Sequence, residues 1–186
     1  MSWQMISLEE VAPTPWRNGG GVTRELLAWP TAQDWDWRMS VAEVDKAGPF
    51  SRYEGVQRWF AVLGGAGVRL ALDGKVHELT AQSPPLCFDG ALACGCELVD
   101  GPTEDFNLML RQGRASAIMV RVLGAFNTQV RPGTRVAVYA WDEPVTVQVN
   151  TEFVTVPSHT LAWRALADGA SVRIETPTAL WMEMAR

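Results

Sequence analysis

Short runs of alternating apolar and polar residues recur along almost the whole sequence, and turns containing glycine or proline separate them. Such period-two alternation is typical of β-strands that bury one face. Helical periodicity is almost absent, and only residues 8–11 suggest one short helical turn. Many short strands joined by turns predict an all-β fold of the sandwich, jelly-roll or barrel type.

The clearest local signal is Asp73-Gly74 between two alternating runs, because a two-residue Asp-Gly turn strongly favours a β-hairpin. The hairpin strands are predicted at residues 68–72 and 75–79. Further strands are predicted at residues 21–29, 37–44, 59–63, 96–99, 106–111, 117–122, 135–141, 145–149, 152–156, 171–175 and 180–184.

The strand pattern of residues 68–110 recurs, with low residue identity, roughly 75 positions later over residues 145–184. This repeat of pattern predicts two similar β-barrel halves packed together. Arg131-Pro132-Gly133 is the best candidate for a junction. We therefore expect an N-terminal half over residues 1–130 that carries the pocket and a smaller C-terminal half over residues 131–186, together one compact unit.

Composition excludes several partners. The 186 residues carry a net charge of −5, with 47% apolar and 20% charged residues, so the chain can bury a core. Sequence-independent nucleic-acid binding needs a basic footprint, and an anionic membrane surface attracts basic segments. We therefore expect neither nucleic acid nor a membrane as partner.

The cysteines and histidines bear on compartment and metal binding. Cys87, Cys94 and Cys96 form an odd, clustered set, which does not suit a disulfide framework, and the N-terminus lacks the pattern of a signal peptide. We therefore expect a cytoplasmic protein. His77 and His159 are far apart and have no His or Cys neighbour at ligand spacing, so no metal site is expected.

The segment Pro15–Gly21 ends in three consecutive glycines, which are costly in conformational entropy. They suit a sharp bend or a close backbone approach, and exposed amides at such a place could bind an anion. The alternative is a plain loop that leads into a strand. The pattern is not that of a phosphate-binding P-loop.

Two predicted strands carry polar side chains at period two. Arg38 and Ser40 share one strand face, which either meets water or lines a cavity. Asp105, Asn107 and Arg111 share a face of a later strand. In a small barrel this face is either the lumen, where it suits a small polar ligand, or the outside.

Two further segments offer an arginine and a carboxylate. Arg58 stands at the start of a strand, where it is either solvated or free to hold a carboxylate by two parallel hydrogen bonds. Asp89, in Phe88-Asp89-Gly90, is either a turn residue or a partner for one of the arginines.

Taken together, the motifs resemble those of the HutD/Ves family in order and spacing over roughly residues 13–113. The resemblance rests on Pro15–Gly21 with Thr23 and Glu25, Trp37–Glu43, Gly48–Ser51, Phe88–Gly90 and Asp105–Met109. It implies a cupin-type β-barrel, an RmlC-like jelly roll, in the form of a bicupin. It also implies a link to bacterial histidine utilisation, with no established catalytic step and no metal or other cofactor.

The resemblance also implies a set of ligand-binding residues, none with a catalytic role. This chain has Arg17 where the family usually has lysine, which keeps the charge. The implied pocket residues are Trp16, Arg17, Asn18, Thr23, Glu25, Arg38, Ser40, Arg58, Phe88, Asp89, Asp105, Asn107 and Arg111.

The leading hypothesis is a non-catalytic protein that senses, buffers or regulates by binding a small anionic metabolite: urocanate, formiminoglutamate or formylglutamate. The alternative is a metal-free cupin enzyme, a hydrolase or isomerase, with Glu25, Asp89 or Asp105 as general base. The nearby arginines oppose that role, because they lower the pKa that a carboxylate base needs raised.

A third hypothesis is a scaffold or homodimer that acts through exposed aromatic surface. Burial is the commoner fate of tryptophan in a β-rich protein. The residues considered for such a surface are Trp3, Trp29, Trp35, Trp141 and Trp181.

Overall fold

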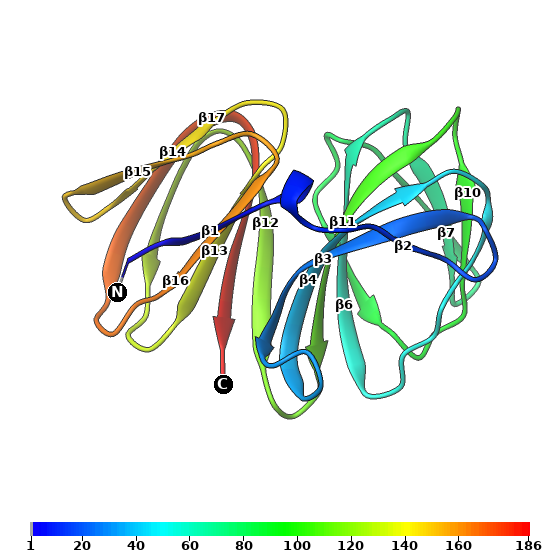
Figure 1. Cartoon of the computed structure of the whole chain (residues 1–186), viewed down its shortest axis with the longest axis horizontal. Coiled ribbons are helices and arrows are strands. Elements are labelled where there is room, and N and C mark those ends of the chain that lie inside the picture. The colour runs from blue at the N-terminus through cyan, green and yellow to red at the C-terminus, as the bar shows by residue number, and fades with distance from the viewer. Residues whose placement is uncertain (1) are drawn as a thin grey trace. The chain divides into compact units, whose positions relative to one another are not determined.

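A computed structural model describes residues 2–186, which form β-strands apart from turns, loops and one 3₁₀ turn, η1 (Leu8–Glu10) (Figure 1). The all-β prediction is confirmed, and η1 coincides with the one short helical turn expected. The described chain divides into two compact units. One unit spans Val11–Ala115. The other, here called the C-terminal unit, contains the segment up to Glu10 together with Ser116–Arg186.

This division differs from the boundary expected near Arg131. The long strand β12 (Ser116–Val130) pairs along most of its length with β17 (Ala170–Ala185), so residues 116–130 belong to the C-terminal unit. In the same way β1 (Gln4–Ser7) pairs with β16 (Thr160–Ala165). Strand pairing across long sequence separations therefore decides the grouping, and a local turn signal does not report it.

The 11–115 unit contains two antiparallel sheets. The six-stranded sheet has the order β2 (Thr14–Pro15), β3 (Gly21–Pro30), β4 (Trp35–Val44), β11 (Thr103–Arg111), β6 (Val56–Gly64) and β9 (Leu86–Asp89). The four-stranded sheet has the order β5 (Gly48–Phe50), β10 (Cys94–Leu98), β7 (Val68–Leu72) and β8 (Lys75–Leu79).

Apolar side chains from both sheets of this unit pack into one core cluster. Phe60 and Val62 of β6 lie in it with Leu70 of β7 and with Cys94 and Cys96 of β10. The two sheets therefore enclose a common core, as in a β-sandwich. The predicted hairpin β7–β8 is confirmed, with positive φ at both turn residues, 47° at Asp73 and 73° at Gly74.

The C-terminal unit is built around β17. Its sheet has the order β1, β16, β13 (Arg135–Ala140), β17, β14 (Val145–Val149) and β15 (Glu152–Val156), and β12 also pairs with β17. The buried members of its core cluster are all apolar, among them Val138, Val147, Ile174 and Trp181.

The sequence predicted two strands, at 171–175 and 180–184, where the structure has the single strand β17. The first part of β17 pairs with β14 up to Glu175, and the second part pairs with β13 from Ala179 onward. Pro177 lies between these two stretches, where the register with β12 also shifts. The missing amide of proline therefore removes no ladder hydrogen bond from either stretch.

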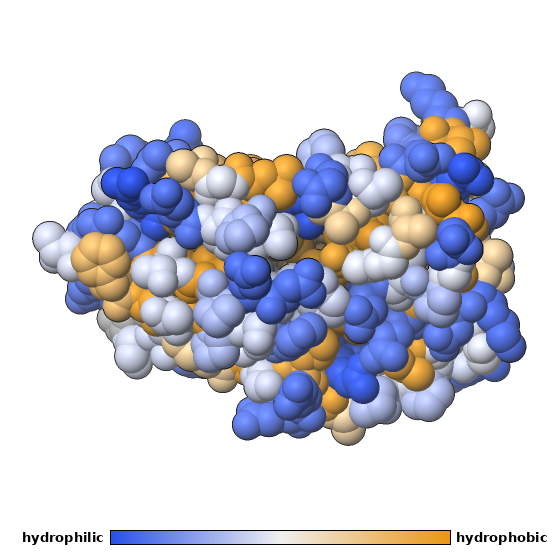
Figure 2. All heavy atoms as spheres, turned by 90° about the horizontal axis from the view of Figure 1, so that it is seen from above, coloured by the Kyte–Doolittle hydropathy of each residue, from blue (hydrophilic) through white to orange (hydrophobic). Residues whose placement is uncertain are grey.

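The five tryptophans considered for a docking surface are not prominently exposed. Trp35, Trp141 and Trp181 are buried, and Trp3 and Trp29 are half-buried. On the face seen in Figure 2, hydrophilic residues interrupt the apolar areas. Among residues 2–186, no helix has the length and apolar character needed to cross a membrane.

Candidate functional site

One face of the six-stranded sheet carries polar side chains in rows that run across the strands. Residues opposite one another on antiparallel strands are neighbours on the same face, and residues two apart along a strand share that face. The central row consists of Glu25, Ser40, Asn107 and Phe60. The row on one side consists of Arg38, Met109 and Arg58, and the row on the other side of Thr23, Ala42, Asp105 and Val62.

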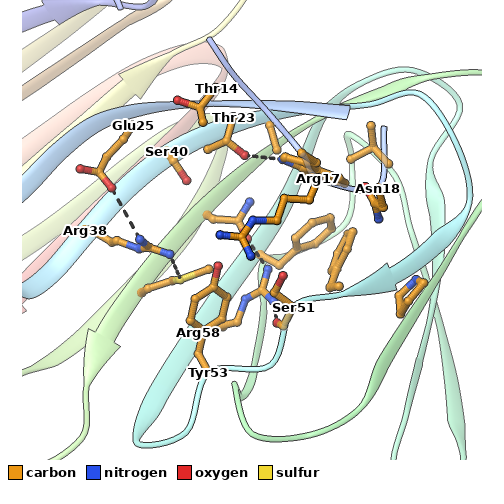
Figure 3. Close-up of a pocket in the computed structure, with 18 of the residues that line it drawn as sticks. Thr14, Arg17, Asn18, Thr23, Glu25, Arg38, Ser40, Ser51, Tyr53 and Arg58 are labelled. Atoms are coloured by element: carbon orange, nitrogen blue, oxygen red, sulfur yellow. Dashed lines mark hydrogen bonds and ion pairs between the residues drawn. The ribbon is translucent and has the colours of Figure 1, made fainter. Parts of the chain in front are cut away.

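These rows, apart from Asp105 and Val62, form the floor of a cavity of about 590 Å³ (Figure 3). The segment before β3, together with β5 and the segment after it, supplies most of the remaining walls. Nine of the predicted site residues line it: Trp16, Arg17, Asn18, Thr23, Glu25, Arg38, Ser40, Arg58 and Asn107. The face of β4 that carries Arg38 and Ser40 therefore lines a cavity.

Arg58 is the most deeply buried charged residue on the cavity. Only 5% of it is exposed, and burial lowers the pKa of its guanidinium from the ordinary value. Its Nη2 donates to Asn107 Oδ1 at 2.8 Å, and its Nη1 donates to the carbonyl oxygen of Ser51 at 3.5 Å. Among residues 2–186 no carboxylate lies within ion-pair distance of it. Arg58 is thus a buried cation held by neutral oxygens.

Aromatic rings surround the Arg58 guanidinium. Its Cζ lies 5.2 Å from the ring centroid of Phe88, 5.4 Å from that of Phe50 and 5.8 Å from that of Tyr53. Cations over ring faces are stabilised by the ring quadrupole, and the stabilisation grows when water is excluded. The rings compensate part of the cost of burial and leave the charge in place.

Arg38 occupies the same row and has a different partner. Its Nη1 lies 3.6 Å from Glu25 Oε2, and its Nη2 contacts Met109 Sδ at 3.3 Å. Its Cζ lies 5.2 Å from the ring centroids of both Trp35 and Tyr53. A β-bulge follows Glu25 in β3, where the register with β4 shifts. Bulges re-aim neighbouring side chains, and here Glu25 lines the cavity beside Arg38.

The triple glycine serves the backbone in two ways. Gly19 has a φ of 65°, and a Cβ on Gly21 would stand 2.1 Å from the carbonyl oxygen of Glu43. The segment therefore contains both a bend and a close backbone approach, which was one of the two alternatives expected for it, the other being a plain loop. The amides of Gly19 and Gly20 donate to the Trp16 carbonyl and to Asn18 Oδ1, so neither is free to hold an anion.

The loop between β2 and β3, which contains two of these glycines, carries Trp16 and Arg17 to the cavity. The Trp16 indole nitrogen donates to Thr23 Oγ1 at 2.8 Å, and its ring meets Phe50 edge to face at 6.2 Å. The side chain of Arg17 points down into the cavity toward Arg58 (Figure 3). The loop thereby adds one aromatic wall and one exposed cation.

Asp105 does not line the cavity, although it shares the face of Asn107. It is fully buried in its row between Ala42 and Val62. Its Oδ2 accepts a hydrogen bond from the Thr103 hydroxyl at 2.9 Å, and its Oδ1 has no partner. Burial raises the pKa of Asp105 from 3.8 to about 7. The prediction that this face is inward holds for Asn107, whereas Asp105 is enclosed in protein.

Three other predicted site residues also lie outside the cavity lining. Phe88 stands behind Arg58, as one of its three rings. Asp89 is exposed, and its Oδ1 accepts the amide of Ala91, which is the turn role considered for it. Arg111 lies at the end of β11, with its Cζ 4.9 Å from the ring centroid of Trp35.

The sequence analysis missed half of the lining residues. Four of them come from β5 and the segment after it, a part of the chain that sequence patterning marks only as a turn-rich connection, although Gly48–Ser51 is one of the motifs that carry the resemblance. The lining residues not predicted are Thr14, Pro15, Ala42, Val44, Pro49, Phe50, Ser51, Tyr53, Phe60 and Met109.

The donor set suits an anion. Three guanidinium groups and the side-chain amides of Asn18 and Asn107 line the cavity, together with aromatic walls and a single carboxylate, Glu25. Such groups bind carboxylates and phosphates by charge-assisted hydrogen bonds. Residues 2–186 contain no group of three or more His, Cys, Asp or Glu side chains that could hold a metal ion.

Comparison with known sequences finds relatives that match part of this chain. An uncharacterized 21.2 kDa protein in the hutC 3′ region of Pseudomonas putida is 33% identical over 116 residues, which cover 61% of each chain. Protein Ves of Cronobacter sakazakii is 38% identical over 120 residues, which cover 64% of this chain and 66% of Ves. The matches thus span less than two thirds of the length of these relatives.

Two solved structures match over nearly the full length. A conserved protein of unknown function from Pseudomonas aeruginosa PAO1 has a TM-score of 0.88 at 26% identity and covers 100% of both chains. HutD from Pseudomonas fluorescens SBW25 has a TM-score of 0.83 at 28% identity and covers 99% of this chain and 98% of that one.

A more distant likeness concerns the fold alone. Oxalate decarboxylase from Lactobacillus farciminis, a cupin-fold protein, has a TM-score of 0.67 at 9% identity and covers 99% of this chain and 86% of that one. The expected cupin-type fold is therefore confirmed. The HutD family model matches residues 8–182, nearly the whole sequence. The resemblance drawn from the motifs is thus confirmed, and this chain belongs to the HutD family.

Proposed function

We propose that the 11–115 unit binds a small carboxylate from histidine breakdown, and that the protein senses, buffers or regulates that pathway without catalysing a step in it. The observation that carries this proposal is Arg58. It is a buried guanidinium on a cavity wall, and no carboxylate of residues 2–186 lies within ion-pair distance of it.

Burying a cation without an opposite charge does not stabilise the folded protein. Removing a charge from water is expensive, and proteins normally pair such a group with an opposite charge. Asn107 and the Ser51 carbonyl satisfy two of its donors but supply no negative charge. A ligand carboxylate would supply it, and its oxygens would find the Asn107 amide nitrogen beside the guanidinium. Asn107 thus acts as both an orienting group for Arg58 and a ligand donor.

The rest of the cavity supports recognition of a small organic acid. Trp16, Phe50 and Tyr53 offer apolar walls, and Ser40 and Glu25 offer hydroxyl and carboxylate groups for the amide, formyl or imidazole end of a ligand. A cavity of about 590 Å³ lies within the usual range for small-molecule sites. Two charge-assisted anchors with apolar burial suit dissociation constants near micromolar, about −8 kcal/mol.

The link to histidine breakdown rests on relatives. One relative is named for its position in the hutC 3′ region, and the solved HutD from Pseudomonas fluorescens is named with a formate condition. We extend this pathway to the present chain and choose urocanate, formiminoglutamate and formylglutamate as candidate ligands. The free thiols of all three cysteines suit the cytoplasmic location that we propose for such a protein.

The alternative of a metal-free enzyme has less support. Of the three carboxylates considered as general base, only Glu25 lines the cavity, and Arg38 is paired with it. Asp89 caps a turn, and Asp105 is enclosed away from the lining. Release of formate or ammonia from a pathway intermediate, followed by mass spectrometry, is the outcome that would favour an enzyme.

The deciding experiment is a thermal-shift and calorimetry panel on wild type and Arg58→Met. The panel contains histidine, urocanate, formiminoglutamate, formylglutamate, glutamate and formate. In the wild type, a ligand at 100 times its Kd should raise stability by about 2.7 kcal/mol, which is several degrees. In Arg58→Met this shift should vanish, because the methionine fills the site without a charge.

The stability of Arg58→Met without ligand provides a second and more specific test. Replacing a buried unpaired charge by an apolar side chain of similar length is often neutral or stabilising, here by about 1 kcal/mol. Arg58→Met should therefore be at least as stable as wild type without ligand. Arg52→Met is the matched control, since Arg52 is exposed and lies off the cavity. A ligand shift that survives in Arg58→Met would overturn the proposal.

A further inference from the structure

The charges that line the cavity do not balance. The charged lining residues are Arg17, Arg38, Arg58 and Glu25. Glu25 and Arg38 form an ion pair at 3.6 Å, which accounts for one positive and the one negative charge. Neither Arg17 nor Arg58 has a carboxylate within ion-pair distance among residues 2–186. Two positive charges therefore remain without a counter-charge.

The two unbalanced charges come from different elements and differ in exposure. Arg58 belongs to β6 and lies on the cavity floor with 5% of its surface exposed. Arg17 belongs to the loop between β2 and β3 and is exposed. In Figure 3 the Arg17 side chain extends from the loop into the cavity, toward Arg58. One cation is thus fixed at the floor and the other is carried by the rim.

Apolar surface connects the two cations. Trp16, next to Arg17, meets Phe50 edge to face, and Phe50 lies 5.4 Å from Arg58 Cζ. Trp16 and Phe50 both line the cavity. A ligand that reaches from one guanidinium to the other would therefore lay a short apolar chain along these rings.

We propose that this site selects dicarboxylates over monocarboxylates, with one carboxylate on Arg58 and Asn107 and the second on Arg17. The proposal rests on the carboxylate-binding function argued above and names its ligand class. A monocarboxylate would neutralise only one of the two cations. A phosphate group could also carry two charges, but it lacks a chain to cover the aromatic wall.

The test compares ligands of matched chain length by isothermal titration calorimetry. Glutarate and butyrate share a three-carbon chain and differ in one group, a second carboxylate against a hydrogen atom. Malonate, succinate and adipate vary the distance between carboxylates, and inorganic phosphate represents the alternative dianion. One additional charge-assisted pair should make glutarate, or the best dicarboxylate of the series, bind about tenfold more tightly than butyrate.

Arg17→Gln separates the two ends of the ligand. The variant should lower the affinity for the best dicarboxylate by about tenfold and leave the affinity for butyrate unchanged. Because Arg17 is exposed on a loop, the variant should keep its fold. Arg52→Gln removes the same charge off the cavity and should change neither affinity.

The outcomes separate this inference from the function on which it rests. Equal affinity for glutarate and butyrate, or no effect of Arg17→Gln, would overturn dicarboxylate selection and leave the carboxylate site standing. Tighter binding of phosphate than of every dicarboxylate would overturn it in favour of a phosphate ligand. Absence of binding by any carboxylate would overturn both proposals together.

Discussion

The two units of this chain differ in what they bury. Among residues 2–186, the polar and charged side chains buried in the 11–115 unit are Asp36, Ser40, Arg58, Thr103, Asp105 and Asn107. Those buried in the C-terminal unit are Thr134, Thr160 and Thr176. The first set includes a cation and two acids, whereas the second is threonine throughout, although both units are antiparallel β-structures.

The difference indicates that the two units have different roles. Buried charge costs free energy, and ionisable groups with perturbed pKa values cluster at functional sites. In the 11–115 unit the buried charge lies on or next to the rows that face the cavity, as with Arg58 and Asp105. The C-terminal unit is held by a continuous apolar cluster around Ile174 and Trp181. We infer that ligand chemistry belongs to the first unit and that the second is structural.

The largest expected effect tests the structural half of this comparison. Trp181 is fully buried in the C-terminal cluster, so Trp181→Ala should lower the free energy of unfolding by about 3–5 kcal/mol. Urea denaturation followed by circular dichroism measures the loss. Carboxylate affinity, measured where the variant is still folded, should not change.

The control for that variant comes from the same unit. Phe153 is 70% exposed on β15, so Phe153→Ala should stay within about 0.5 kcal/mol of wild type. A change in carboxylate affinity in Trp181→Ala would contradict the assignment of ligand chemistry to the other unit alone.

The next effect tests the buried acid of the 11–115 unit. The folded protein holds the Asp105 proton more tightly than the unfolded chain, because burial raises the pKa of this group from 3.8 to about 7. Its stabilising contribution is complete below about pH 4 and is lost as the pH rises through 7. Asp105→Asn stays neutral, so it should be more stable than wild type at pH 8 by on the order of 2–4 kcal/mol.

The measurement is the free energy of unfolding of both proteins at several values between pH 5 and 8. The asparagine keeps an acceptor oxygen for Thr103, which limits other changes. Asp89→Asn is the control, because Asp89 is exposed and its turn bond also survives the substitution. If the stabilities of wild type and Asp105→Asn changed in parallel with pH, ionisation of Asp105 would not destabilise the folded protein, and the prediction would be wrong.

Local signals in the sequence predicted much of this fold. Asp73-Gly74 defines its hairpin from two neighbouring residues, because positive φ at both positions matches the twist of the strands. β17 could not be predicted as one strand. Its continuity across Pro177 depends on a change of partner from β14 to β13, and both of these strands are distant from β17 in the sequence.

The candidate site, like the fold, could be predicted only in part from local signals. Period two predicted that Arg38 shares a face with Ser40, and Asn107 with Asp105, since strand geometry fixes which side chains share a face. It left open whether these faces meet water or line a cavity, and the structure shows that Arg38, Ser40 and Asn107 line one. The same rule grouped Asp105 with Asn107, but only the packing of the second sheet decides where the cavity ends. Tyr53 lies on a connection whose path depends on closure of the unit, so no local pattern marked it.

The smallest effect compares two hairpins that occupy matching places in the repeat. In each, two five-residue strands flank a two-residue turn, Asp73-Gly74 in one and Asn150-Thr151 in the other. Gly74 has a φ of 73°, and a Cβ added to it would meet no atom within 4 Å, so Gly74→Ala should cost about 1 kcal/mol through backbone strain alone. Thr151 does not have positive φ, and Thr151→Ala should stay within about 0.5 kcal/mol of wild type. Urea titration of both variants measures the difference. Equal losses would mean that the two turns share one backbone conformation, and the repeat would then extend from the strand pattern to the turn itself.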